Sequence, residues 1–210
     1  METREFGLTG FARIEMRGTI EFQLERSDTY AIVATGEALR HIRVGRDGDL
    51  LRLGHAQDSL GRIPGGGQLK VRVTMPLLRE LVLLGGGKGT VSGFASREAL
   101  RLRLTEASNL KGDIEAGAAD FELWGASILA LRGGAESLAL HATGANLVDL
   151  SAFRVHNADV RLEFATSGVV SLDGVLNAHL TGRSTLRWLG EPAMGDITVA
   201  DFATLARKAY

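Results

Sequence analysis

The sequence predicts an all-β protein whose second half is a right-handed parallel β-helix, and three observations support this fold class. The 210 residues include 27 glycines but only 3 prolines, which indicates many tight corners between short strands. Between Phe11 and Met75 apolar and polar residues alternate, as in half-buried strands. Beyond Met75 a unit of about twenty residues recurs, which is the mark of a repeat architecture.

The first part of the chain, residues 1–76, is predicted to form β-strands that continue into the solenoid. Alternation is clearest in residues 20–24, 50–53 and 69–73. Turn-forming residues separate these stretches, at 26–28, at 45–49 as a hairpin turn, and in the Pro-Gly-Gly-Gly run at 64–67 as a flexible loop.

Residues 77–190 are predicted to form the β-helix itself, as six repeated units. The inward-facing anchors of successive units are Leu84, Leu104, Leu123, Ala142, Phe164 and Leu180, with spacings of 20, 19, 19, 22 and 16 residues. Two positions before the anchors stand further apolar residues, namely Val82, Leu102, Phe121, Leu140, Leu162 and Ala178. No unit can bury its own apolar stripe, so the units must stack at about 4.8 Å to form one interior.

Each anchor is followed by a corner and then by a second inward strand. The corners are short stretches of mostly small or polar residues, in which glycine recurs at Gly86, Gly125, Gly144 and Gly182. Glycine there permits a positive φ or a close approach of neighbouring backbones. The second inward strand is marked by Thr90, Leu110, Leu129, Val148, Val170 and Leu186, and two residues later by Gly112, Leu131, Leu150, Leu172 and Trp188. The 22-residue step places an inserted loop at residues 151–159.

Residues 191–210 are predicted to cap the open end of the solenoid with a short amphipathic helix over 198–210. Phe202, Leu205, Ala206 and Ala209 share one helical face, and Asp201 is a suitable N-cap. A leucine-rich repeat is a poorer explanation, because the fixed Asn or Cys position and the dense leucines of that repeat are missing. An antiparallel sandwich remains a rival, since it too has short strands at about 10-residue spacing.

Charge and composition narrow the classes of partner. With 24 Lys and Arg against 25 Asp and Glu, the net charge of −1 gives no reason to expect a nucleic acid or an anionic membrane. The chain has no cysteine, which excludes thiolate chemistry, and no apolar run long enough to span a bilayer. The N-terminus lacks the apolar core of a signal peptide, so a cell-surface, periplasmic or extracellular location requires that a leader was trimmed.

The sequence resembles a known bacterial family, the GIN-domain putative auto-transporter adhesins. The likeness is carried by Arg4-Glu5-Phe6, by Phe11-Ala12-Arg13-Ile14, by residues 71–81 with the glycine cluster after them, and by residues 188–192, Trp-Leu-Gly-Glu-Pro. The family has a Gly-Ser-Gly-like corner in each unit, which is degenerate here, as in Thr105-Glu106-Ala107-Ser108. The resemblance implies a β-helical fold and a cell-envelope setting, and it supplies no catalytic residues.

Two motifs that suggest chemistry fail on inspection. Residues 85–90, Gly-Gly-Gly-Lys-Gly-Thr, look like a phosphate loop, but Val82 and Gly89 stand where that motif needs glycine and Ser or Thr. The five histidines, His41, His55, His141, His156 and His179, lack metal-ligand spacing. Of these, His141 and His179 lie at similar depths in the repeat, where stacked coils could bring them together, although surface or corner histidines are the simpler interpretation. No metal or cofactor site is predicted.

Enzymatic readings rest on a few polar residues. Asp113, Glu115, Asp149 and Asp173 follow second-strand positions, and stacking would bring some of them to the separation of about 5–9.5 Å found in glycosidases. Solvated outward carboxylates are the simpler interpretation. Ser151, His156 and Asp159 have the side chains of a catalytic triad without a nucleophile elbow. Trp124 and Trp188 have aromatic faces on which a sugar ring could stack. The simpler interpretation is that they are structural residues of the corners and the core.

The function predicted from these observations is a non-catalytic binding or adhesion module of the bacterial cell envelope that contacts a glycan or an envelope protein. One alternative is a polysaccharide hydrolase or lyase with paired carboxylates. Another is a structural or regulatory domain that self-associates as a homo-oligomer, by stacking or by side-by-side packing. The residues do not identify a ligand or a catalytic site.

Overall fold

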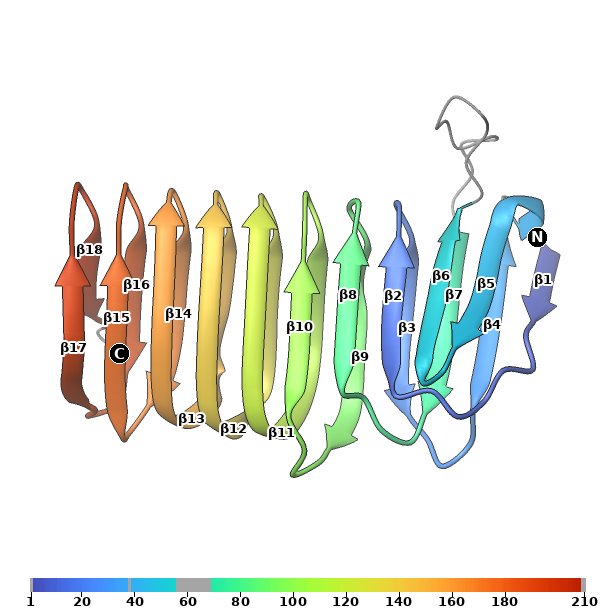
Figure 1. The fold of residues 1–210 in the computed structure, drawn as a ribbon, viewed down its shortest axis with the longest axis horizontal. Coiled ribbons are helices and arrows are strands. Elements are labelled where there is room, and N and C mark those ends of the chain that lie inside the picture. The colour runs from blue at the N-terminus through green and yellow to red at the C-terminus, as the bar shows by residue number, and fades with distance from the viewer. Residues whose placement is uncertain (1, 38, 56–68, 209–210) are drawn as a thin grey trace.

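The computed structural model is an elongated β-solenoid and describes residues 2–37, 39–55 and 69–208 (Figure 1). The flexible loop predicted at 64–67 lies outside these ranges. One short 3-10 helix, η1 (Leu39–His41), accompanies the strands. The strands are β1 (Glu2–Glu5), β2 (Arg13–Arg17), β3 (Glu21–Arg26), β4 (Ala31–Gly36), β5 (Ile42–Asp47), β6 (Leu50–His55), β7 (Leu69–Met75), β8 (Glu80–Leu84), β9 (Lys88–Ala95), β10 (Leu100–Leu104), β11 (Asn109–Gly125), β12 (Ile128–Gly144), β13 (Leu147–Phe164), β14 (Ser167–Leu172), β15 (Val175–Leu180), β16 (Thr185–Leu189), β17 (Ala193–Val199) and β18 (Thr204–Arg207).

The coils stack through parallel strand pairs along two faces. The first face runs from β8 through β10, the later parts of β11, β12 and β13, then β15 and β17. The second face runs from β9 through the early parts of β11, β12 and β13, then β14, β16 and β18. This parallel stacking confirms the predicted β-helix and excludes the antiparallel sandwich.

At the N-terminal end the order of the coils in space differs from their order in sequence. Strand β2 pairs in parallel with both β6 and β8, and β3 pairs in parallel with both β7 and β9. The coil made by β2 and β3 therefore lies between the coil of β6 and β7 and the coil of β8 and β9. Beyond β6 and β7, antiparallel strands β5 and β4 close this end, and β1 pairs with β4 (Figure 1).

The strand register confirms the stacked ladder and corrects two of its predicted anchors. The aligned inward residues are Leu83, Leu104, Leu123, Ala142, Leu162, Leu180 and Val199, at steps of 21, 19, 19, 20, 18 and 19 residues. Leu84 was the wrong choice because it lies on the outer side of β8, next to the inward Leu83. Phe164 was wrong because it lies two residues beyond the inward Leu162, where the chain turns into the corner with a φ of 62°. Thr90 is likewise exposed, and Val91 fills the interior.

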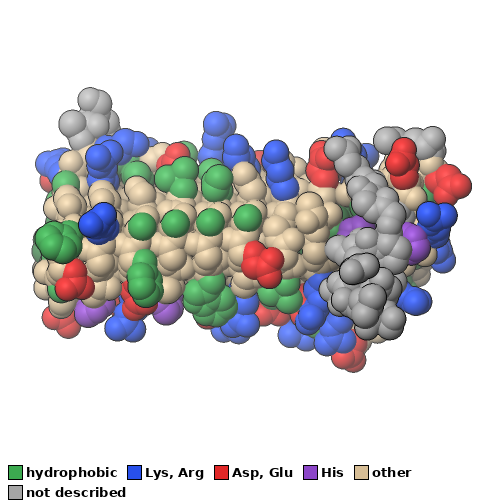
Figure 2. All heavy atoms as spheres, turned by 90° about the horizontal axis from the view of Figure 1, so that it is seen from above, with side chains coloured by type: hydrophobic (Ala, Val, Ile, Leu, Met, Phe, Trp, Pro, Cys, Tyr) green, Lys and Arg blue, Asp and Glu red, His purple; other side chains and the backbone are tan. Residues whose placement is uncertain are grey.

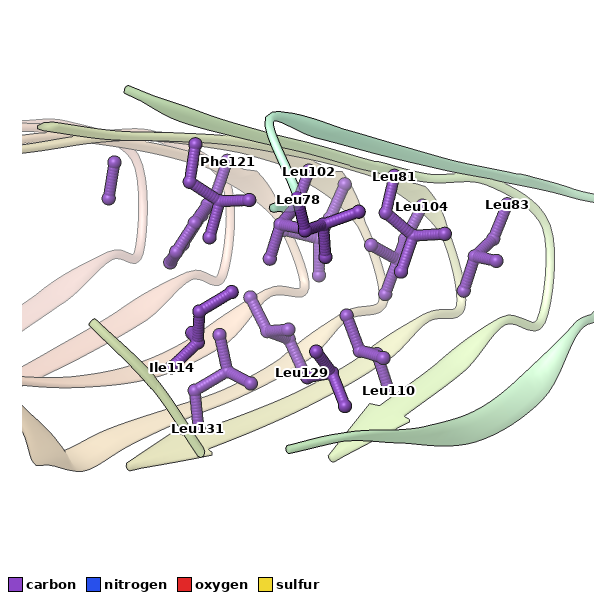
Figure 3. Close-up of a cluster of buried hydrophobic side chains, with 14 of the residues drawn as sticks. Leu78, Leu81, Leu83, Leu102, Leu104, Leu110, Ile114, Phe121, Leu129 and Leu131 are labelled. Atoms are coloured by element: carbon purple, nitrogen blue, oxygen red, sulfur yellow. The ribbon is translucent and has the colours of Figure 1, made fainter. Parts of the chain in front are cut away.

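The interior is a continuous apolar column between the two faces. Figure 3 shows Leu81, Leu83, Leu102, Leu104 and Phe121 of the first face opposite Leu110, Ile114, Leu129 and Leu131 of the second. Leu83, Leu104, Leu110 and Leu129 have no exposed surface. A fully buried leucine stabilises the fold by about 1.5–3 kcal/mol through removal of apolar surface from water. The column is therefore the main source of stability.

A column of buried polar side chains lines the inside of the corner between the first and second faces. It consists of Ser108, Ser127, Asn146, Thr166 and Ser184, each at most 2% exposed. Their hydroxyl and amide groups form hydrogen bonds with backbone amides and carbonyls at the turn. Asn146 Nδ2 donates to the carbonyl of Thr143 at 3.0 Å, and Asn146 Oδ1 accepts from the amide of Ser127 on the preceding coil at 2.9 Å.

Two local predictions were wrong. Residues 198–208 contain no helix, because β17 and β18 continue the alternation and pair with β15 and β16 as one more coil. Residues 151–159 are part of β13 and not a loop, although extra residues do occur there. The register slips by one residue between the Ala130–Asp149 and Arg132–Ala152 pairs, and by three residues between the Leu150–Val170 and Arg154–Ser171 pairs. The division into residues 1–76, 77–190 and 191–210 stays a prediction.

Candidate functional site

Three of the four carboxylates considered for catalysis are hydrogen-bonded or paired with groups other than one another. Asp113 Oδ2 accepts a hydrogen bond from the backbone amide of Gly93 at 2.9 Å. Asp149 Oδ1 accepts from the hydroxyl of Ser151 at 2.6 Å, and Asp173 Oδ1 lies 3.0 Å from His156 Nδ1. The side chain of Glu115 is exposed on β11.

Asp113 and Asp149 line the same shallow hollow of about 390 Å³ on the second face, yet their arrangement does not suit glycoside hydrolysis. Asp113 is in register with Arg132, and Asp149 lies one coil beyond Arg132. Two coils therefore separate the acidic residues, about 10 Å along the axis. The hydrogen bonds from Ser151 lower the pKa of Asp149, whereas a catalytic acid needs a raised pKa.

The triad-like residues do not assemble. Ser151 donates its hydroxyl hydrogen to Asp149, and His156 contacts Asp173. Asp159 lies on the first face, in register with Ala139 and Asn177. No nucleophile is therefore placed beside a base by these three residues.

The histidine pair considered across stacked coils is separated by an arginine. His141 is in register with Arg161, and Arg161 with His179, so the two histidines are two coils apart. His141 Nε2 instead lies 3.3 Å from the hydroxyl of Thr143. Within residues 2–37, 39–55 and 69–208, no three His, Asp or Glu side chains are grouped so as to hold a metal ion.

The most unusual backbone lies at the corner between the first and second faces. Successive coils place Glu106, Gly125, Gly144, Phe164, Gly182 and Asp201 in one column, and all six have a positive φ. At this column the amide of the following residue donates to the carbonyl one coil earlier, as Ala145 does to Gly125 at 2.7 Å. The left-handed conformation is thus required by the stacking of the turns, and glycine adopts it most readily.

Phe164 is the aromatic one of the three non-glycine residues in this column, which also contains Glu106 and Asp201. Its φ is 62°, and its side chain is 64% exposed. A bulky residue in the left-handed region costs about 1–2 kcal/mol, and an exposed aromatic ring contributes nothing to the interior. Stability therefore does not account for Phe164, and strain of this kind concentrates at functional sites.

Other exposed apolar residues follow the same corner, which we call the corner ridge. Figure 2 shows hydrophobic side chains in rows along this edge, seen from above. Leu147 is 51% exposed and Phe202 is 82% exposed. The corner ridge comprises Trp124, Leu147, Phe164 and Phe202, together with the exposed alanines Ala107, Ala126, Ala145 and Ala165 at the crest.

The three aromatic residues of the corner ridge lie on alternate coils but in three adjacent columns. Trp124 is in register with Thr143, Phe164 is in register with Gly144, and Phe202 lies one position further along the turn. Register places Phe164 two coils beyond Trp124, and Phe202 two coils beyond Phe164. The separation along the axis is therefore about 9.6 Å for each step. The guanidinium of Arg103 lies over the ring of Trp124, 5.3 Å from its centroid, which fixes one ring face.

Sequence reasoning found only part of this site. Trp124 was considered a sugar platform, and Trp188 was expected to face inward, where it does lie partly buried against the core. Phe164 was mistaken for an interior anchor. Phe164 occupies a corner position at which other coils have Gly125, Gly144 and Gly182. This correspondence becomes visible only when the strands are aligned in the correct register.

Comparisons with known proteins agree with the fold. The family model described as "Putative auto-transporter adhesin, head GIN domain" matches residues 10–192. No curated protein matches the chain. In the described ranges, no helix is long and apolar enough to cross a membrane.

Solved structures of low sequence identity share the whole architecture. A putative adhesin from Bacteroides fragilis is 16% identical, with a TM-score of 0.91 over 99% of this chain and 96% of that chain. A putative lipid binding protein from Parabacteroides distasonis is 14% identical, with a TM-score of 0.75 and the same coverage. A putative adhesin from Parabacteroides distasonis is 12% identical, with a TM-score of 0.74 and again the same coverage. At these identities the likeness establishes the fold alone.

Proposed function

The chain belongs to the head GIN domain family of putative auto-transporter adhesins, and from this premise we propose that it is a non-catalytic binding module of the bacterial cell envelope. The corner ridge is its contact surface. The ligand is an extended polysaccharide that lies along the solenoid axis. Repeat proteins commonly bind through such long surfaces, because each coil contributes one equivalent position.

The observation that carries this proposal is the strained, exposed Phe164. Glycine at this position would relieve the left-handed strain, as Gly144 and Gly182 do on the adjacent coils. Phenylalanine instead costs folding stability and exposes apolar surface. Both costs are explained when the ring is needed for contact with a ligand.

Spacing and chemistry favour a glycan over a flat protein surface. Aromatic rings on every second coil match a ligand with a regular repeat, such as a β-1,4-linked chain whose alternate sugars present the same face. Thr143 and Thr181 lie on the coils next to those of the aromatic residues and add polar groups at the same edge. Aromatic faces with polar neighbours suit sugars, which have both apolar faces and hydroxyl groups.

Screening on a glycan array, followed by titration of the best polysaccharide, tests the proposal. We expect saturable binding by the chain. Trp124→Ala and Phe164→Gly should each weaken it about tenfold, which corresponds to about 1.4 kcal/mol. Phe164→Gly is the more informative variant, because it should be no less stable than the parent chain. Val175→Ala is the matched control, since Val175 is 40% exposed but lies on the first face away from the ridge.

The outcomes separate the main alternatives. Equal binding by the parent chain and both ridge variants would show that the corner ridge is not the contact surface. Binding to phospholipid vesicles but to no glycan would transfer the proposal to a lipid, the class of ligand that the description of the Parabacteroides distasonis putative lipid binding protein names. Release of reducing ends or unsaturated sugars from a polysaccharide panel would contradict the non-catalytic role and favour the hydrolase or lyase alternative.

A further inference from the structure

Strands β17 and β18 form the last coil among the residues that the structure describes. Strands β17 and β18 pair with β15 and β16 on one side. In the described part of the chain, no strand pairs with their other side. Their outer backbone N–H and C=O groups therefore form an edge that is able to accept another strand.

This edge also exposes a cross-section of the core. Leu176, Ala178 and Leu180 on β15 are at most 3% exposed. Their register partners one coil later, Met194, Ile197 and Val199, are 46%, 37% and 43% exposed. These three residues continue the inward ladder and are exposed because no coil formed by residues 2–37, 39–55 or 69–208 covers them. Such a surface has the composition of an interface rather than of a solvated surface.

The N-terminal end is built in the opposite way. Its outermost strand on the β4 side is β1, with the sequence Glu-Thr-Arg-Glu, and all four residues are exposed. On the other side lies β5, which carries Arg43, Arg46 and Asp47 and pairs antiparallel with β6. Charged residues on edge strands discourage further pairing. The two ends therefore do not complement each other, and head-to-tail stacking of copies is disfavoured.

We infer that the C-terminal coil is an interface for a second copy of this chain, joined tail to tail about a two-fold axis. A two-fold axis pairs β17 with β17 of the second copy, and β18 with β18, as antiparallel strands. Both faces of the solenoid then continue into the second copy, and no other kind of chain is needed. It also buries Met194, Ile197 and Val199 against their counterparts. The described β17 carries one charged residue, Asp196, and β18 carries one, Arg207.

The charges of the edge are compatible with this pairing. If the strands meet around Ile197, antiparallel order places Asp196 opposite Thr198 of the second copy, so like charges do not face each other. Arg207 is occupied by an ion pair with Glu191. The inference does not depend on the corner ridge, since dimer formation and ligand binding are measured separately.

The oligomeric state of the full chain tests this inference. Light scattering should give twice the monomer mass at high concentration, and dilution should halve it. Ile197→Lys should lower the dimer fraction at least tenfold, because it puts a charge into the apolar cross-section. Thr3→Lys, the matched control on the N-terminal edge strand, should leave it unchanged. A concentration-independent monomer of the parent chain, or loss of dimer in Thr3→Lys alone, would overturn the inference.

Crosslinking distinguishes the tail-to-tail arrangement from others. The chain has no cysteine, so Thr198→Cys introduces a single thiol in β17. A short bis-maleimide should convert this variant to covalent dimers, whereas Thr3→Cys should remain monomeric under denaturing conditions. Efficient crosslinking of Thr3→Cys without Thr198→Cys would place the interface at the N-terminal end. This readout also remains valid if Ile197→Lys folds poorly.

Discussion

Phe164 is in register with Gly144 of the preceding coil, and both residues have a left-handed backbone, with φ values of 62° and 120°. The corner thus imposes one conformation on every coil, whichever residue occupies it. Where glycine stands, the conformation costs little; where another residue stands, the cost falls on folding stability. Glu106 and Asp201 have the same left-handed backbone as Phe164, but of these three residues Phe164 also exposes an aromatic ring, which folding alone does not explain.

Glu106 offers a direct measure of this corner strain. It has a φ of 61°, it is exposed, and it lies one coil before Gly125. Glu106→Gly should raise the free energy of unfolding by about 0.5–1 kcal/mol, as relief of left-handed strain outweighs the entropy of the added glycine. Urea denaturation followed by circular dichroism measures the change. A decrease in stability would mean that the glutamate side chain stabilises the turn in another way.

Gly112 should be among the least replaceable glycines. A Cβ atom there would lie 1.8 Å from the carbonyl oxygen of Val91, and its φ is 148°. Gly112→Ala should therefore lower the free energy of unfolding by about 2–4 kcal/mol, through overlap with backbone on the neighbouring coil. Gly45→Ala is the control, because a Cβ at Gly45 would meet nothing within 4 Å. Similar losses in both variants would contradict the close coil contact.

Leu83 and Leu84 test the corrected register. Leu83 has no exposed surface, whereas Leu84 lies on the outer side of β8 and is only partly buried. Leu83→Ala should cost about 2–5 kcal/mol because it leaves a cavity in the apolar column. Leu84→Ala should cost less than half as much. Equal losses, measured by chemical denaturation, would favour the anchor position first predicted from the sequence.

The periodicity of the sequence was sufficient for the fold but not for every register position. Leu104, Leu123 and Leu180 were placed correctly. In each of their units the anchor and the apolar residue two positions before it both face inward. Leu84 failed because an apolar residue also stands on the outer side of β8. Phe164 failed because it keeps the parity of the inward Leu162 but lies at the corner, where the backbone turns the side chain outward. Alternation alone does not distinguish an interior leucine from an exposed aromatic residue one or two positions away.

Long-range pairing was the second source of error. The coil of β2 and β3 lies between coils that follow it in sequence, and no local pattern indicates this order. The predicted C-terminal helix failed for a related reason. Phe202, Leu205 and Ala206 fit a helical face, but pairing of Leu186 with Leu205 across β16 and β18 determines the conformation. Tertiary pairing overrode a weak local preference.

Alanine substitutions in the buried polar column should lower the free energy of unfolding about as much as substitutions in the apolar column. Asn146→Ala leaves the amide of Ser127 and the carbonyl of Thr143 without their side-chain partner, so the expected loss is about 2–4 kcal/mol. Ser108→Ala removes one hydrogen bond, from Ser108 Oγ to the carbonyl of Thr105 at 2.8 Å, and should cost about 1 kcal/mol. Thermal or urea unfolding gives the ranking. The reverse order would indicate that Asn146 is not essential to the corner.

Acid should weaken the structure through surface ion pairs that connect neighbouring coils. Hydrogen bonds from Arg79 lower the pKa of Glu98, with Arg79 Nη2 3.2 Å from Glu98 Oε1. Hydrogen bonding from Arg13 likewise lowers the pKa of Asp49. Because each carboxyl has a lower pKa in the folded chain than in the unfolded chain, its stabilisation is fully present above the unfolded value. That stabilisation is lost as the pH falls through the folded value.

The melting temperature should therefore be nearly constant from about pH 7 to pH 5 and should decline below about pH 4, where carboxyl groups of ordinary pKa become protonated. Glu98→Gln should have a lower melting temperature than the parent chain at pH 7 and should approach it near pH 2, since the ion pair is then absent from both. The effect at pH 7 is expected to be small, because exposed ion pairs are screened by water and salt. Glu5→Gln is the control, as Glu5 is exposed on β1. Parallel melting curves for Glu98→Gln and the parent chain across this pH range would show that the Arg79–Glu98 pair does not couple the coils.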